Sequence, residues 1–435
     1  MIKEVLCANT PIRNPKRGKE SRVGRASWYR YYAGFSTTFV QDALTYAAPN
    51  AHARILDPWV GSGTTTEIAA AQGFEALGYD INPAMVIVAK ARLLDPTVHP
   101  SLPSILDDLL SKAAQRRPVE PAEPLAQWFT TGTAGALRQF EHAVQTLLIN
   151  PRDYRPLFEL PTLNQVSSLA AFFYVAAFRV LRELLCSFGT TNPTWIKLPG
   201  TDERVTVPEK RLHAILREAV NAMANHLKTP EQRAVSRCSA TIEKATSSSL
   251  PISDCSIDTV ISSPPYCTRI DYVNKTSPEL ALLGATSVAV KRLRDQMIGT
   301  PTIHKATPEV ETAWGPTCNA AVDAIARHTS YASKSYYWKT YMQYFHGLGA
   351  SLREIDRTLK AAGRCMLVVQ DSYFKDVHID LAKIIEEMGQ ALGWGSFTRA
   401  DFPTKKTIVG LNTHARDYGN PKQSIETVLG FRKER

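Results

Sequence analysis

Residues 57–65 have the sequence DPWVGSGTT and decide the fold class of this chain. Residues 53–56 before them predict a strand, and residues 65–72 predict a helix that ends at Gly73. A second strand is expected at residues 75–79. A strand, a glycine turn, a helix and a further strand predict the start of a βαβ unit, and therefore an α/β fold.

The glycine turn favours a ligand that contains adenosine. A pair of glycines suits a purely structural turn equally well, but Gly61 and Gly63 also let a ligand approach the backbone at a helix N-terminus. A triphosphate loop would need a lysine before the threonine, and a dinucleotide site would need glycine in place of Thr66. Asp80 ends the second predicted strand, where a carboxylate can accept hydrogen bonds from a ribose diol.

A second motif, SPPY at residues 263–266, follows a strand predicted at residues 257–262. Open α/β sheets bind ligands at the carboxyl ends of their strands. Two consecutive prolines have no N–H group, so the turn offers hydrogen-bond acceptors, which suit an amino group. If the Ser263 hydroxyl and the Pro264 carbonyl accept hydrogen bonds from the exocyclic amine of a base, they favour the nucleophilic form of that amine. Tyr266 would then stack on a base that is flipped out or single-stranded.

These motifs together resemble those of the S-adenosylmethionine-dependent DNA amino-methyltransferases, the cytosine-N4/adenine-N6 type. Residues 57–65 resemble motif I, residues 78–83 motif II and residues 31–36 motif X, while SPPY matches motif IV, (D/N/S)PP(Y/F/W). The resemblance covers residues 28–95 and 236–435. It implies a Rossmann-like methyltransferase sheet, the cofactor S-adenosyl-L-methionine and DNA as partner. The implied catalytic residues are Ser263, Pro264, Pro265 and Tyr266, and the implied cofactor-binding residues are Phe35, Asp57, Pro58, Gly61, Gly63, Thr64, Asp80 and Asn82.

The chain departs from the family pattern at the end of the third strand. The family usually has an acidic residue there, whereas this chain has Ala245 and Thr246. Three explanations stay open: a backbone carbonyl replaces it in binding the cofactor's adenine amine, Asp258 replaces it, or the affinity for the cofactor is weak. Cys267 follows Tyr266, and no chemical role is expected for it because amine methylation needs no covalent intermediate.

The motif order predicts how the domains are organised. Residues 96–235 are mostly helical in pattern and separate motifs X, I and II from motif IV, which resembles the order in the alpha-type enzymes. We therefore expect an α/β catalytic domain from residues 1–95 and 236–435, with residues 96–235 as an inserted helical target-recognition domain. Within the insertion, residues 191–197 favour a capped loop over a DNA contact.

Helices are expected at residues 166–188, 210–227, 336–361 and 379–392, and later strands at 365–370, 407–411 and 427–431.

Composition describes a globular chain with a basic excess. Of 435 residues, 44% are hydrophobic and 21% charged, and the net charge is +10, which suits a polyanionic partner without requiring one. Residues 1–30 carry eight basic and two acidic residues, so they form either a solvated tail or a phosphate-contacting arm.

The longest uncharged apolar run, residues 169–178, is too short to span a bilayer. The first residues do not resemble a secretory signal, and seven cysteines without a CxxC pair suit free thiols rather than zinc. We expect a cytoplasmic, nucleoid-associated protein without membrane contact.

The sequence thus predicts a site-specific DNA methyltransferase in which cytosine N4 is favoured over adenine N6, because serine at position 263 is commoner among the family's cytosine enzymes. Two alternatives remain. An RNA guanine-amine methyltransferase usually has Asn or Asp in place of Ser263, and a non-catalytic cofactor-binding DNA module would need Ser263 or Gly61 degraded. A cognate restriction nuclease or defence system is a candidate partner.

Overall fold

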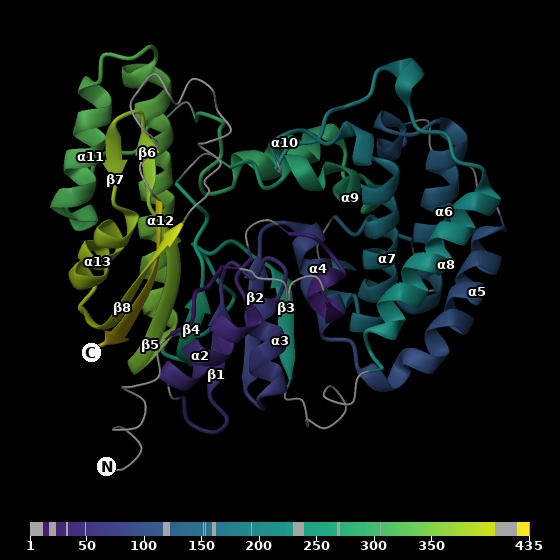
Figure 1. Ribbon diagram of the computed structural model, residues 1–435, viewed down its shortest axis with the longest axis horizontal. Coiled ribbons are helices and arrows are strands. Elements are labelled where there is room, and N and C mark those ends of the chain that lie inside the picture. Colours follow the sequence, from purple (N-terminus) through teal and green to yellow (C-terminus); the bar gives the residue numbers. More distant parts are fainter. Residues whose placement is uncertain are drawn as a thin grey trace.

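The computed structural model describes residues 12–16, 23–31, 34–47, 49–115, 122–150, 152, 154–158, 162–192, 194–228, 239–267, 270–304, 306–404 and 424–434. Within them, one mostly parallel seven-stranded sheet has the order β3-β2-β1-β4-β5-β9-β8 (Figure 1). Its strands are β1 (Arg54–Asp57), β2 (Glu75–Asp80), β3 (Ala240–Lys244), β4 (Ile257–Ser262), β5 (Leu359–Gln370), β8 (Trp394–Thr404) and β9 (Ser424–Lys433). Strands β1 to β5 are parallel, and β9 runs antiparallel to β5 and β8. The predicted Rossmann-like α/β class is confirmed.

Helices cover both faces of the sheet because side chains alternate along each strand. In β1, Leu56 belongs to the core beneath α11 (Gly315–Arg327), α12 (Trp338–Thr358) and α13 (Leu381–Ala391). Its neighbour Ile55 belongs to the core beneath α2 (Thr37–Ala47) and α3 (Thr64–Ala71). The chain reverses its strand order between β1 and β4, so the carboxyl ends of these two strands form the topological switch point of the sheet.

Most predicted elements lie within a few residues of the observed ones, but the long helix was predicted to end too late. Helix α12 ends at Thr358, and β5 begins at Leu359, six residues before the predicted strand. Leu359 pairs with Ile257, and Ala362 has a φ of +61° beside an irregularity in the β4–β5 register. This pairing with β4 overrides the helical pattern. The strand predicted at 407–411, and residues 1–11 and 17–22 of the basic N-terminal segment, lie outside the described residues.

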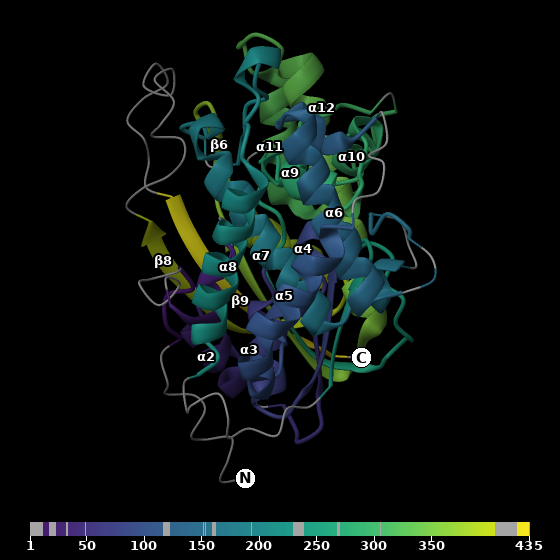
Figure 2. The ribbon, with the colours of Figure 1, turned by 90° about the vertical axis from the view of Figure 1, so that its right-hand side faces the viewer.

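A block of helices lies between β2 and β3, as the sequence predicted, and faces the viewer in Figure 2. Its main members are α5 (Leu102–Ala113), α6 (Thr131–Leu148), α7 (Ser168–Leu184) and α8 (Glu209–Asn225). They share one apolar core with α4 (Pro83–Arg92), which follows β2. The buried amine of Lys90 on α4 donates to the carbonyls of Leu163, Asn164 and Val166, at 3.0–3.2 Å. Because α4 and the block share this core, the domain boundaries at 96 and 235 stay a prediction.

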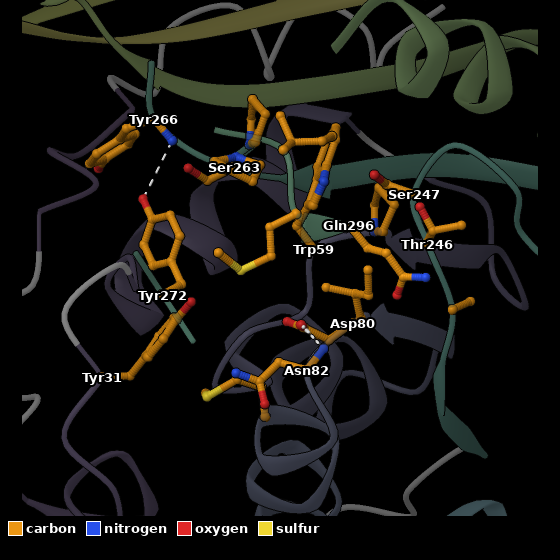
Figure 3. A pocket seen from close by; sticks show the side chains of 18 residues that line it. Tyr31, Trp59, Asp80, Asn82, Thr246, Ser247, Ser263, Tyr266, Tyr272 and Gln296 are labelled. Atoms are coloured by element: carbon orange, nitrogen blue, oxygen red, sulfur yellow. Dashed lines mark hydrogen bonds between the residues drawn. The ribbon is translucent and has the colours of Figure 1, made fainter. Parts of the chain in front are cut away.

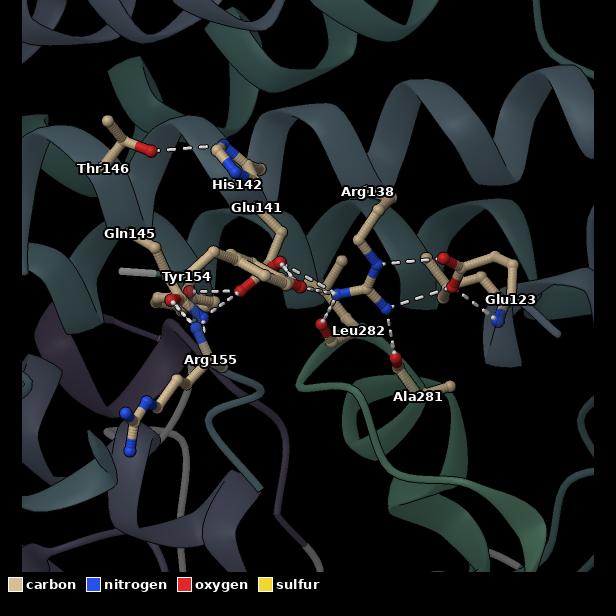
Figure 4. A network of polar contacts seen from close by, with 12 residues as sticks. Glu123, Arg138, Glu141, His142, Gln145, Thr146, Tyr154, Arg155, Ala281 and Leu282 are labelled. Atoms are coloured by element: carbon tan, nitrogen blue, oxygen red, sulfur yellow. Dashed lines mark hydrogen bonds and ion pairs between the residues drawn. The ribbon is translucent and has the colours of Figure 1, made fainter. Parts of the chain in front are cut away.

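A buried polar network joins the block to α9 (Ser277–Leu282), the helix that follows the SPPY segment (Figure 4). Arg138 on α6 pairs with Glu123 at 3.0 Å and with Glu141 at 2.9 Å. The same guanidinium donates to the carbonyls of Ala281 at 2.8 Å and Leu282 at 2.7 Å. It therefore adds a donor to two carbonyls at the end of α9, of which that of Ala281 also accepts the Gly284 N–H at 3.0 Å.

A second arginine holds the other end of the same helix. Arg182 on α7 pairs with the buried carboxylate of Glu279, which also accepts a hydrogen bond from Tyr29. The guanidinium of Arg182 lies 4.9 Å from the centre of the Tyr29 ring. The helical block therefore fixes α9 at both of its ends. Among the described residues, no helix is both long and apolar enough to cross a membrane.

We predict that Arg138→Met lowers the free energy of unfolding by about 3–5 kcal/mol, because it leaves Glu141 buried without its cation. Arg217→Met is the matched control, since its partner Asp107 is exposed and such pairs contribute under about 1 kcal/mol. Urea unfolding of both variants measures the difference. Equal losses would show that Arg138 is not the link between the block and α9.

Candidate functional site

One pocket at the carboxyl ends of β1, β2, β3 and β4 collects most of the predicted site residues (Figure 3). About 770 Å³ of empty space, open to solvent, lies between the segments that follow these strands. This position is the topological switch point, where open α/β sheets bind ligands. Of the predicted residues, the pocket is lined by Pro58, Asp80, Asn82, Ser263, Pro264, Pro265 and Tyr266.

Asp80 ends β2 and ties the glycine turn to the next turn. Its Oδ2 accepts the Gly61 N–H at 3.0 Å, and its Oδ1 accepts the Asn82 N–H at 2.9 Å. Burial raises the pKa of the Asp80 carboxyl to about 6, although these backbone hydrogen bonds oppose the rise. With a further backbone hydrogen bond from Ile81, the carboxylate still has acceptor capacity, because its two oxygens offer about four lone-pair sites.

Asn82 connects the pocket floor to the segment that follows SPPY. Its Oδ1 accepts the Ala84 N–H at 3.0 Å and so caps α4, a role for which Asn is strongly preferred. Its Nδ2 donates to the Thr276 hydroxyl at 2.9 Å. The buried amide therefore holds α4 and the residues before α9 together beneath the pocket.

Both positions in the turn need glycine because other residues lie very close to them. Neither glycine lines the pocket. Gly61 has a φ of +47°, and a Cβ there would lie 2.9 Å from the Tyr31 ring, which lines the pocket. Gly63 has a φ of +80°, and a Cβ there would lie 2.9 Å from the Cα of Ala89 on α4. Thr64 begins α3, and its hydroxyl accepts a hydrogen bond from Arg92 at 3.2 Å.

Asp57 lies beneath the pocket instead of lining it. Its Oδ1 accepts the Ser262 hydroxyl at 2.5 Å and the Trp59 N–H at 3.2 Å. Burial raises the pKa of the Asp57 carboxyl to about 6, against the effect of these hydrogen bonds. Asp57 therefore joins the ends of β1 and β4. Phe35 also does not line the pocket; it packs edge-on against Phe39, with ring centroids 5.3 Å apart.

Two tyrosines position the SPPY turn. Tyr344 on α12 is buried, and its hydroxyl donates to the carbonyl of Pro265 at 2.8 Å. The Tyr272 hydroxyl accepts the Tyr266 N–H at 3.4 Å (Figure 3). Sequence analysis placed Tyr344 on a helix but gave no sign of this contact, because it joins residues 79 positions apart.

The Tyr266 side chain connects the turn to β9. Burial raises the pKa of the Glu426 carboxyl on β9, while Lys16 and a hydrogen bond from Tyr266 oppose the rise. The next residue, Cys267, is buried, and its carbonyl accepts the Ser372 hydroxyl at 3.3 Å. Cys267 is not among the pocket-lining residues.

The pocket end beside β3 is polar but uncharged. Ala245, Thr246 and Ser247 line it together with Gln296, which follows α10 (Ser287–Asp295) (Figure 3). No pattern in the sequence had indicated Gln296.

The expectation that Asp258 could replace the missing acid is wrong. Asp258 lies near the amino end of β4, at the opposite edge of the sheet from the pocket. Its carboxylate accepts hydrogen bonds from Lys360 at 2.8 Å and from the Arg54 N–H at 2.9 Å. Among the described residues, no group of three or more His, Cys, Asp or Glu is arranged to hold a metal ion.

Comparison with known proteins finds similarity to an enzyme of the methyltransferase class. No family model matches the chain. Over 302 residues, the chain is 24% identical to the Type II methyltransferase M.BsoBI of Geobacillus stearothermophilus. The match covers 64% of this chain and 57% of that protein, so the chain spans little more than half the length of its relative.

We predict that Gly63→Ala costs more free energy of unfolding than Gly73→Ala. Both glycines have positive φ, which costs about 1–2 kcal/mol for alanine, but a Cβ at Gly73 meets nothing within 4 Å. The contact with Ala89 should add a further ~1–3 kcal/mol, because α3 and α4 must separate. Urea unfolding measures both. Indistinguishable values would mean that α4 does not constrain the turn.

Proposed function

We propose that this chain is an S-adenosylmethionine-dependent DNA methyltransferase that methylates the exocyclic amine of a flipped base. The observation that carries the proposal is one pocket lined by both Asp80 and the SPPY turn. A ribose acceptor and an amine acceptor in one pocket suit the transfer of a methyl group from a nucleoside cofactor to the amine of a base. The 24% identity to a Type II methyltransferase supports the same reaction class.

The residues present fit the cofactor. Asp80 offers a carboxylate to the ribose hydroxyls, and glycine at position 61 leaves room for Tyr31 to approach the turn. Thr246, Ser247 and Gln296 offer uncharged polar groups beside β3 for the adenine, in place of the family's acidic residue. When bound, the cofactor supplies an electrophilic methyl group on its sulfonium.

The SPPY turn acts on the base. Hydrogen bonds from the target amine to the Ser263 hydroxyl and the Pro264 carbonyl favour the form whose lone pair can attack a methyl group. Tyr344 and Tyr272 hold the turn from two sides, so these acceptors keep their directions without reorganising. The Tyr266 ring offers a stacking face to the base.

Cytosine N4 is the favoured target and adenine N6 the alternative, because Ser263 stands at the first motif position. Methylation of an RNA amine and a non-catalytic binding role are the further alternatives, and both predict that DNA stays unmodified. Genomic DNA from cells with and without the protein would be compared by single-molecule kinetic sequencing, which distinguishes N4-methylcytosine from N6-methyladenine. The proposal fails if purified protein and S-adenosylmethionine leave DNA unmodified.

We predict that Tyr266→Ala lowers methylation by an amount equivalent to about 1–3 kcal/mol per stacked base, while cofactor binding persists. Tyr266→Phe keeps the ring and should retain most activity, and Ser263→Ala should lower kcat more than DNA affinity. Steady-state kinetics on unmodified DNA measures all three. An equal loss in Tyr266→Phe and Tyr266→Ala would assign the effect to the hydroxyl and its bond to Glu426, and would rule out stacking.

We further predict that affinity for S-adenosylmethionine falls as the pH drops from 7 to 5. A carboxyl with a pKa of about 6 is mostly ionised at pH 7 and mostly protonated at pH 5, and its neutral form is the weaker acceptor. Calorimetry should show reduced affinity for Asp80→Asn at pH 7, and a smaller pH dependence. An unchanged pH dependence in Asp80→Asn would transfer the titration to Asp57, whose pKa is also about 6.

A further inference from the structure

The helical block presents an exposed tryptophan on the loop formed by residues 189–198. The Trp195 side chain is 41% exposed and Leu198 is 61% exposed, with Lys197 exposed between them. Tryptophan is highly buried on average in folded proteins, so an accessible indole beside a cation is informative. Such a pair combines a stacking face with a phosphate contact.

The loop is ordered by its own hydrogen bonds. The Asn192 side chain accepts the Thr194 N–H at 3.0 Å and the Thr194 hydroxyl at 2.8 Å. Gly189 and Ile196 form an antiparallel bridge, which closes the loop at its base. The predicted capped loop is therefore present, and it holds the backbone of Trp195, whose N–H donates to the Asn192 carbonyl at 3.1 Å. A preformed loop loses less entropy when it binds.

The loop is also attached to the segment that follows the SPPY turn. The Ile196 N–H donates to the Asn274 side chain at 3.0 Å, and Lys275 donates to the carbonyl of Trp195 at 3.4 Å. Asn274 is two residues after Tyr272, which lines the pocket, so their Cα atoms are at most about 8 Å apart. Trp195 therefore lies on a loop bonded to the rim of the pocket.

The same rim carries positive charge. Burial lowers the pKa of the Lys275 amine; Arg182 adds to this effect, while Glu279, the ion-pair partner of Arg182, opposes it. The exposed Arg30 precedes Tyr31, which also lines the pocket. Cations around the opening suit the phosphates of a nucleic acid whose base enters the pocket.

We propose that Trp195 stacks in the gap that the extruded base leaves in duplex DNA, while Lys197 contacts a backbone phosphate. The inference rests on the proposed function. Extrusion breaks stacking on both sides of the target and costs a few kcal/mol. An indole that enters the gap restores part of that stacking, as apolar side chains do at unstacked steps. The helical block would then support base extrusion directly.

The experiment measures kcat/KM for unmodified plasmid DNA over a range of salt concentrations, with cofactor affinity by calorimetry. Trp195→Ala should lower kcat/KM roughly five- to hundredfold without changing its dependence on salt, because the indole is neutral. Trp195→Phe should recover part of the loss. Lys197→Gln should reduce the slope against log salt by about one. Leu147→Ala, an exposed apolar change on α6, is the control for the block.

Each outcome separates the stacking role from the proposed function. Wild-type protein that binds no S-adenosylmethionine and modifies no DNA contradicts the methyltransferase itself. If the wild type methylates and Trp195→Ala matches Leu147→Ala, only the stacking role is wrong. A Trp195→Ala variant with an altered salt slope or weaker cofactor affinity would also overturn that role, because the tryptophan would then be acting on charge or on the pocket.

Discussion

The pocket depends on the buried hydrogen bond between Asp57 and Ser262. These residues end β1 and β4, the neighbouring strands at which the strand order reverses. The glycine turn begins one residue after Asp57, and SPPY begins one residue after Ser262. A carboxylate at this junction therefore sets the separation of the two loops that line the pocket. Its cost is desolvation, visible in the raised pKa of Asp57, and the hydrogen bonds from the Ser262 hydroxyl and the Trp59 N–H offset part of it.

Three of the predicted residues that line the pocket share one property. Pro58, Asp80 and Ser263 each stand within one residue of a strand's carboxyl end, and parallel strands bring those ends to one edge of the sheet. For residues at strand ends, a local sequence pattern is therefore enough to predict that they lie close together in the fold. Asp258 is the opposite case. It was a candidate only because it is acidic, but it lies near the start of β4 and therefore at the edge of the sheet opposite the pocket.

The contacts that sequence analysis missed join distant segments through side chains. The bond from Tyr344 to Pro265 and the bond from Ile196 to Asn274 each depend on how α12 and the helical block pack. No local periodicity encodes them. The same holds for the end of α12, where pairing of Leu359 with β4 replaces a helix that the sequence favours. Tertiary packing therefore decides how the predicted residues are held.

The helical block is bound to the segment after SPPY at several independent points. Arg138 holds the end of α9, Arg182 pairs with Glu279, and the 189–198 loop bonds to Asn274. Separating the two parts would leave buried carboxylates without their cations, which is far more costly than breaking surface contacts. A rigid-body motion of the block would therefore carry α9 with it. Whatever the block binds can thus act on the segment that contains Tyr272 through these contacts.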